Sequence, residues 1–211
     1  MDIISSIKKA WNLAIHPSKA TPMSVKDALI FYYSFAIIPV LITAILAGVF
    51  TNTGLLGAVI EIATILILSP IVIFIEAAII HLFGKFLFRK FQKPYMATFT
   101  AVVIAAIPST LFSWLLLITS ISAPVNLVIN IIFDIWILII LTMAIMKLQK
   151  TSGVFAVLSW LVPLIIIIII VSFIIVTLLS AISTLPGGLG ALQNGTLNST
   201  LVHTFNVTTT I

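Results

Sequence analysis

The sequence predicts an all-α, polytopic membrane protein: a bundle of five transmembrane helices preceded by an amphipathic interfacial helix at the N-terminus. Of its 211 residues, 62% are hydrophobic and only 7% are charged, and the mean hydropathy is +1.35. A soluble domain carries about 25% charged residues, because polar side chains have to cover its surface. Long apolar stretches alternate with short polar connections that hold nearly all the charge. These observations exclude a soluble enzyme, a soluble nucleic-acid-binding domain and a disordered chain.

Five apolar stretches are long enough to cross a bilayer, whose hydrocarbon core of about 30 Å needs about 20 helical residues. Their boundaries are 28–50, 55–83, 96–118, 125–146 and 154–182. At about 1.5 Å per residue, the second and fifth stretches exceed the thickness of the core. We therefore expect these two helices to tilt or bend.

The segment before the first span is predicted to be an amphipathic helix over residues 3–15. Isoleucines and Trp11 recur on one side at helical spacing, whereas Lys8 and Lys9 lie on the other. Such a helix lies in the headgroup layer, with its lysines toward anionic lipid. A docking surface for a soluble partner is the alternative.

The basic residues determine the predicted orientation. All ten lie before the first span, between the second and third, or between the fourth and fifth, and the opposite side has no Lys or Arg. Because positively charged loops stay in the cytoplasm, residues 1–27 are predicted to be cytoplasmic. Residues 28–182 then form the membrane domain, and residues 183–211 form an extracytoplasmic tail rich in Thr and Asn.

The tail contains three N-x-S/T sequences, at Asn194, Asn198 and Asn206. Such sequences are acceptors for N-glycosylation when they are exposed to a glycosylating compartment. Their place in the tail agrees with the orientation that the charges predict. We therefore expect a glycoprotein.

The loop between the second and third spans alternates phenylalanines with four cations. The cations are Lys85, Arg89, Lys90 and Lys93. Basic and aromatic residues together also bind single-stranded nucleic acid. Between two spans, however, phenyl groups are placed more favourably among lipid tails, and each cation near an anionic leaflet contributes about 1 kcal/mol. We predict contact with the anionic inner leaflet and no nucleic-acid partner.

Two acidic residues are predicted to lie near the middle of the membrane. Glu76 is nine residues from Lys85, and Asp134 is thirteen from Lys147. Asn126 and Asn130 continue a polar ridge from Asp134 at spacings of four. Intramembrane polar residues form interhelical hydrogen bonds or line a proton or cation path, and both interpretations stay open.

Proline and small residues are expected to shape the bundle. Prolines interrupt four spans, and hydroxyls beside them, such as that of Ser69 next to Pro70, are placed to satisfy freed backbone groups. The third span carries a ridge of small residues that favours close helix packing. The ridge consists of Ala97, Ala101, Ala105, Ser109 and Ser113. We expect this span to be central.

Nothing in the sequence indicates catalysis. The chain has no Cys, which excludes disulfides and Cys-ligated metals. It has no H-E-x-x-H, no G-x-S-x-G and no phosphate-binding glycine loop. We therefore predict no enzyme activity, no metal and no cofactor.

With this layout, the chain resembles the Yip1 family of polytopic membrane proteins over roughly residues 7–180. The resemblance starts with Lys8, Lys9 and Trp11 followed by Pro17, and continues through the basic loop into a span with Pro108. It ends with a span carrying Trp136, a short polar turn and a last apolar span. The resemblance implies five spans with the N-terminus inside. Eukaryotic members are associated with small GTPases and vesicle traffic, and they carry an Asp-Leu-Tyr-Gly-Pro-type cytoplasmic motif. This chain lacks the motif, so GTPase binding is not expected to carry over.

The sequence leaves three functions open. The first is a non-enzymatic, Yip1-like scaffold of the archaeal plasma membrane that organises membrane or partner proteins. Its partners would be other membrane proteins or further copies of the same chain. The second is an accessory subunit of a larger complex, whose intramembrane acids pair with basic residues of a partner. The third is a small transporter or proton-coupled channel that uses Glu76 and Asp134.

Overall fold

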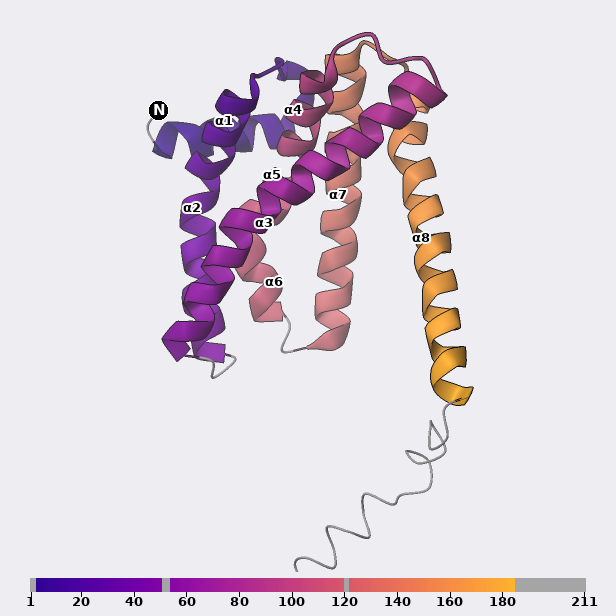
Figure 1. Cartoon of the computed structure of the whole chain (residues 1–211). Helices are drawn as coiled ribbons and strands as arrows, with labels where there is room; N and C mark the ends of the chain where they lie inside the picture. Colours follow the sequence, from indigo (N-terminus) through magenta and orange to yellow (C-terminus); the bar gives the residue numbers. More distant parts are fainter. Residues whose placement is uncertain (1–2, 51–53, 120–121, 185–211) are drawn as a thin grey trace, which may run out of the picture. The chain divides into compact units, whose positions relative to one another are not determined.

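The computed structural model describes residues 3–50, 54–119 and 122–184, and across these ranges the chain is all-helical, without strands (Figure 1). The predicted all-α class is confirmed for this part of the chain. The helices are α1 (Ile3–Ile15), the 3-10 turn η1 (Pro17–Lys19), α2 (Val25–Phe50), α3 (Gly54–Leu82), the π-helical turn η2 (Phe83–Leu87), α4 (Tyr95–Ala105), α5 (Ile107–Leu111), α6 (Ser113–Thr119), α7 (Ala123–Gln149) and α8 (Gly153–Thr184).

Four of these helices are long and apolar enough to cross a membrane. Their apolar segments are Val25–Leu46 in α2, Ile62–Leu87 in α3 with η2, Ala123–Gln149 in α7 and Gly153–Ala181 in α8. A shorter apolar segment, Tyr95–Leu111, covers α4 and α5. Helices of this length and composition support insertion into a membrane.

The segment predicted as the third span, residues 96–118, is not one continuous helix. The chain from α4 to α6 breaks at Ala106 and again at Phe112. Pro108 accounts for the first break, because proline has no N–H to donate to the carbonyl of Ile104 and its ring crowds that carbonyl. The hydroxyl of Ser109 donates to the carbonyl of Ala106 (3.0 Å) beside this break.

Helix α4 lies at the centre of the bundle. All nine of its residues from Ala97 to Ala105 are buried. Helices α1, α2, α3 and α7 all pack against it. The ridge of small residues begins here, and Ala101 and Ala105 are 0% and 3% exposed.

The chain divides into two compact units, Met1–Pro163 and Leu164–Ile211, so that α8 belongs to both. The helical bundle described here is that of the first unit. In the second unit, residues 164–181 are exposed on every side of the helix and are mostly isoleucine, valine and leucine.

A tyrosine on α2 compensates for the proline in α3. Pro70 leaves the carbonyl of Leu66 without its helical donor. The hydroxyl of Tyr33 donates to this carbonyl at 2.8 Å. Ser69, which the sequence offered for this role, makes no such bond in the described structure. The proline in one helix is thus coupled to the packing of its neighbour.

Replacing Tyr33 with Phe is expected to lower the free energy of unfolding by about 1 kcal/mol, because the Leu66 carbonyl loses its donor in an apolar setting. Denaturant unfolding in detergent micelles measures this. The matched control is Tyr32→Phe, because the Tyr32 hydroxyl has no hydrogen-bond partner among the described residues. Equal effects of the two substitutions would contradict the assignment.

Candidate membrane and partner interface

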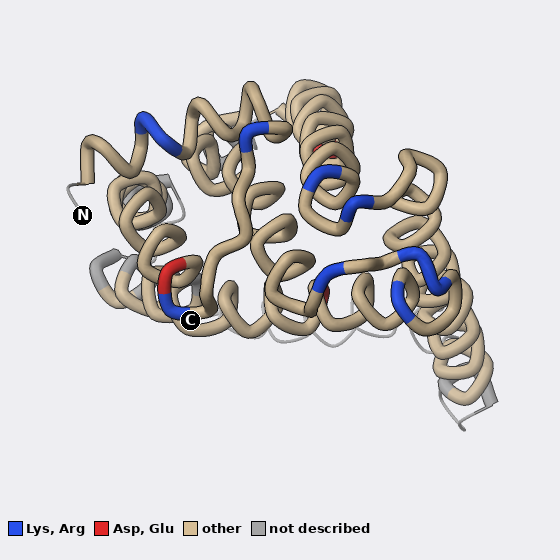
Figure 2. Tube along the Cα trace, turned by 90° about the horizontal axis from the view of Figure 1, so that it is seen from above, with Lys and Arg blue, Asp and Glu red and all other residues tan. Residues whose placement is uncertain are grey.

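Every Lys and Arg of the chain lies at one end of the first unit, which we call the cationic end (Figure 2). They lie on α1, η1, the start of α2, η2 with its following loop, and the end of α7. The cations come from five places in the sequence, and the fold brings them to one face. This end is the strongest candidate for a functional surface.

Helix α1 lies crosswise to α2 at this end and packs on α2, α4 and α5 (Figure 1). Its residues divide into three faces rather than the two that the sequence indicated. One face, formed by Ser6, Ala10, Leu13 and Ala14, is buried in the bundle. A second face exposes Ile4, Trp11 and Ile15, and a third exposes Lys8, Lys9 and Asn12. Small residues on the first face let the helix approach the bundle closely.

Trp11 and Lys9 contact the bundle as well as the surroundings. The ring of Trp11 lies 6.1 Å from that of Phe112 and 6.3 Å from that of Trp136, both edge to face. The ammonium of Lys9 lies 5.3 Å from the centre of the Phe31 ring. These contacts fix the orientation of α1. Lys8 remains exposed.

The basic loop is folded back onto the end of α3. Two backbone N–H groups, those of Lys90 and Phe91, donate to the carbonyl of Gly84. Arg89 takes the left-handed backbone conformation (φ 53°) that this reversal requires. Phe91 is 6% exposed and lies against Gly84 and His81. One phenylalanine of the loop is therefore a buried anchor and not a lipid contact.

The remaining loop residues point outward or toward α8. Phe86 is 69% exposed, and Lys85 and Arg89 are exposed beside it. The ammonium of Lys90 lies 5.0 Å from the centre of the Phe155 ring. Phe86 and its neighbouring cations are thus exposed, and contact of this loop with lipid stays a prediction.

A buried polar cluster that the sequence analysis missed holds the loop to the bundle. Gln149 is 0% exposed and joins three segments. Its amide nitrogen donates to Thr98 Oγ1 (2.8 Å) and to the carbonyl of Pro94 (3.3 Å), and its amide oxygen accepts from the N–H of Lys93 (2.9 Å). Thr98 Oγ1 also lies 2.9 Å from Nδ1 of His81. The available signal was that Gln149 continues the helical spacing of buried Leu141, Ile145 and Leu148.

The two acidic residues predicted to lie within the membrane are on the exposed sides of their helices. Glu76 on α3 and Asp134 on α7 are both exposed, and neither carboxylate has a hydrogen bond or an ion pair within the described ranges. Helix α3 is inclined to α2 and α7 (Figure 1), so each residue along α3 spans less depth than a residue along α7. The residues that the structure describes contain no group of acids and histidines able to bind a metal.

The asparagine ridge on α7 is hydrogen bonded locally. The amide of Asn130 donates to the side chain of Asn126 (2.7 Å) and to its carbonyl (2.9 Å). The amide of Asn126 donates to Thr119 Oγ1 on α6 (3.2 Å). The ridge thus joins α6 to α7, as expected for interhelical hydrogen bonding.

The small-residue ridge contributes a second polar contact between helices. Ser113 Oγ lies 2.7 Å from Thr43 Oγ1 on α2, and it donates to the carbonyl of Thr110 (3.2 Å). Close approach of the two helices allows this bond. The three predicted glycosylation sites, Asn194, Asn198 and Asn206, lie outside the described residues.

Comparison with known proteins finds no match: no protein-family model, no curated protein and no solved structure matches this chain. The resemblance to the Yip1 family therefore stays an expectation from the sequence.

Proposed function

We propose that the chain is a non-enzymatic, Yip1-like membrane protein that organises membrane or partner proteins through the cationic end. In this proposal the N-terminus is cytoplasmic, and α4 to α6 form a broken third crossing among five. The N-terminal helix is the amphipathic, interfacial element. The observation that carries the proposal is the placement of α1, whose buried face fixes it crosswise on the bundle while its apolar and basic faces stay exposed.

The two exposed faces of α1 fit the two layers of a membrane surface. Ile4, Trp11 and Ile15 match the acyl boundary, and Lys8 matches the headgroups. Lys85 and Arg89 add cations on the neighbouring loop, and each contributes about 1 kcal/mol near an anionic leaflet. The same rigid, basic surface fits an acidic face of a partner protein.

Replacing Lys8 and Lys85 together with Glu is expected to abolish both the recovery of partner proteins and the clustering of acidic lipid around the protein. Both side chains are exposed, and neither makes a hydrogen bond or an ion pair within the described residues. Two measurements apply: recovery of stoichiometric partners from mild detergent, and clustering of a fluorescent acidic lipid around the protein in vesicles.

The matched control replaces both lysines with Arg, which keeps the charge and is expected to keep both activities. Wild-type behaviour of the Glu variant in both assays would overturn the proposal. Size-exclusion chromatography of each variant checks that the fold is intact.

One observation favours a second candidate, an accessory subunit of a larger complex. Glu76 and Asp134 are exposed on apolar helices without partners in the described structure, and a carboxylate facing lipid costs about 2.5–3.5 kcal/mol. Basic residues on a partner's helices would remove this cost. In the same purification, loss of a partner from Glu76→Gln with Asp134→Asn, but not from the charge-reversed variant, would favour this candidate.

A further inference from the structure

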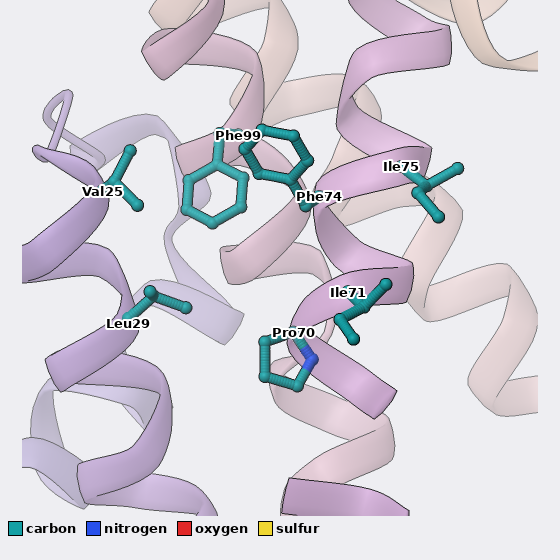
Figure 3. Close-up of a pocket in the computed structure, with 7 residues that line it drawn as sticks. All are labelled: Val25, Leu29, Pro70, Ile71, Phe74, Ile75 and Phe99. Carbon is teal, nitrogen blue, oxygen red and sulfur yellow. The ribbon is translucent and has the colours of Figure 1, made fainter. Parts of the chain in front are cut away.

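An apolar groove opens between α2, α3 and α4 (Figure 3). Its volume is about 260 Å³. The lining residues are Val25, Leu29, Pro70, Ile71, Phe74, Ile75 and Phe99. Figure 3 shows Val25 and Leu29 on one wall, Pro70 to Ile75 on the other, and Phe99 between them. No charged or hydrogen-bonding side chain is among the lining residues.

Contacts within the bundle hold the walls of the groove in place. The Tyr33 hydroxyl joins α2 to α3 at Leu66, one turn before Pro70. The Tyr95 hydroxyl donates to the carbonyl of Phe74 (2.8 Å), and the Phe74 ring packs edge to face on Phe99 (5.9 Å). The groove is therefore preformed rather than made by a moving segment.

The groove extends to the start of α2, at the cationic end. Val25 is the first residue of α2, and Lys26 beside it is exposed. Lys26 is two turns before Tyr33 on the same face of the helix, and Tyr33 reaches α3. This register places Lys26 on the side of α2 that faces α3. The neighbouring carboxylate of Asp27 accepts a hydrogen bond from the Ser24 hydroxyl (2.6 Å).

We propose that the groove binds one acyl chain of an acidic phospholipid from the leaflet at the cationic end, with the phosphate at Lys26. An apolar lining excludes water and has no partner for a polar ligand, whereas an alkyl chain gains dispersion contacts on three sides. The cation at the mouth then selects an anionic headgroup. This site is separate from α1 and the basic loop, and it does not depend on the proposed function.

Photo-crosslinking with an acidic phospholipid that carries a diazirine on its acyl chain tests this site in the full chain reconstituted in vesicles. We expect saturable labelling of Ile71 and Ile75 that excess unlabelled acidic lipid competes away. Exposed isoleucines on α7, such as Ile131 and Ile132, provide the internal standard for ordinary lipid contact. Equal, non-saturable labelling of both groups would show bulk lipid only and would overturn the proposal.

Two variants and their neighbours test the groove without disturbing the bundle core. Ile71→Trp fills the groove and is expected to reduce labelling at Ile75 about tenfold. Val72→Trp is the control, because Val72 is similarly exposed but does not line the groove. Lys26→Gln is expected to weaken competition by acidic lipid about fivefold, whereas Lys19→Gln is expected to have no effect. If labelling at Ile75 is the same in Ile71→Trp and Val72→Trp, the groove does not hold the acyl chain.

Discussion

Replacing Gln149 with Leu is expected to lower the free energy of unfolding by about 3 kcal/mol. Leucine has a similar size but cannot hydrogen bond, so the Lys93 N–H loses its acceptor. The Pro94 carbonyl loses one of its two donors and keeps the N–H of Ala97. Thr98 loses a donor at the same time. A buried polar group left unsatisfied costs about 1–3 kcal/mol. Denaturant unfolding in detergent measures the loss.

The effect of Gln149→Leu should be concentrated in the basic loop, because the amide is what joins residues 93 and 94 to α7. Hydrogen exchange is expected to accelerate at the backbone amides of residues 90–93 and to stay unchanged in α2. Gln92→Leu is the control, since Gln92 is exposed and its side chain has no hydrogen-bond partner within the described structure. Comparable losses in the two variants would show that Gln149 is not the anchor.

Replacing Gly84 with Ala is the second change expected to have a large effect. A methyl group at this position would overlap the ring of Phe91, which is buried against it. Overfilling a packed site costs about 1–3 kcal/mol, although alanine otherwise favours a helix by about 1 kcal/mol over glycine. We therefore expect a lower melting temperature in detergent and greater exposure of the loop to protease.

The double variant Gly84→Ala with Phe91→Leu distinguishes a steric cause from a backbone effect. Leucine vacates part of the ring's volume, so the second change should recover some of the stability that the first one loses. Gly153→Ala is the matched control, because its added methyl group would meet Met146 only at ordinary contact distances of 3.5 Å and 3.7 Å. Additive losses in the double variant would exclude a clash between residues 84 and 91.

Most of the long helices could be located from the amino-acid sequence. The stretches predicted at 28–50 and 125–146 correspond to α2 at Val25–Phe50 and α7 at Ala123–Gln149. This succeeds because backbone groups in a bilayer must be satisfied within the segment, so an apolar stretch of sufficient length has little choice but to form a helix. The sequence also predicted that the cations lie on one side of the membrane, because the positions of charged residues between the spans can be counted directly.

Which side chains compensate for the prolines depends on how the helices pack, and the sequence did not predict it. Pro70 and Pro108 were visible in the sequence, but one is compensated by Tyr33 on another helix and the other breaks its span. Phe91 is a further example. The alternation of basic and aromatic residues predicted that it contacts lipid, but it is buried against Gly84.

The buried polar cluster shows the physical reason most clearly. Gln149 bonds to Thr98, fifty-one residues earlier, and to the loop that precedes it. Periodicity reports only which face of a helix is apolar, whereas a hydrogen bond depends on distance and direction between two elements. The sequence therefore determined which segments form the membrane helices, and the packing of α3, α4 and α7 determined which polar groups meet.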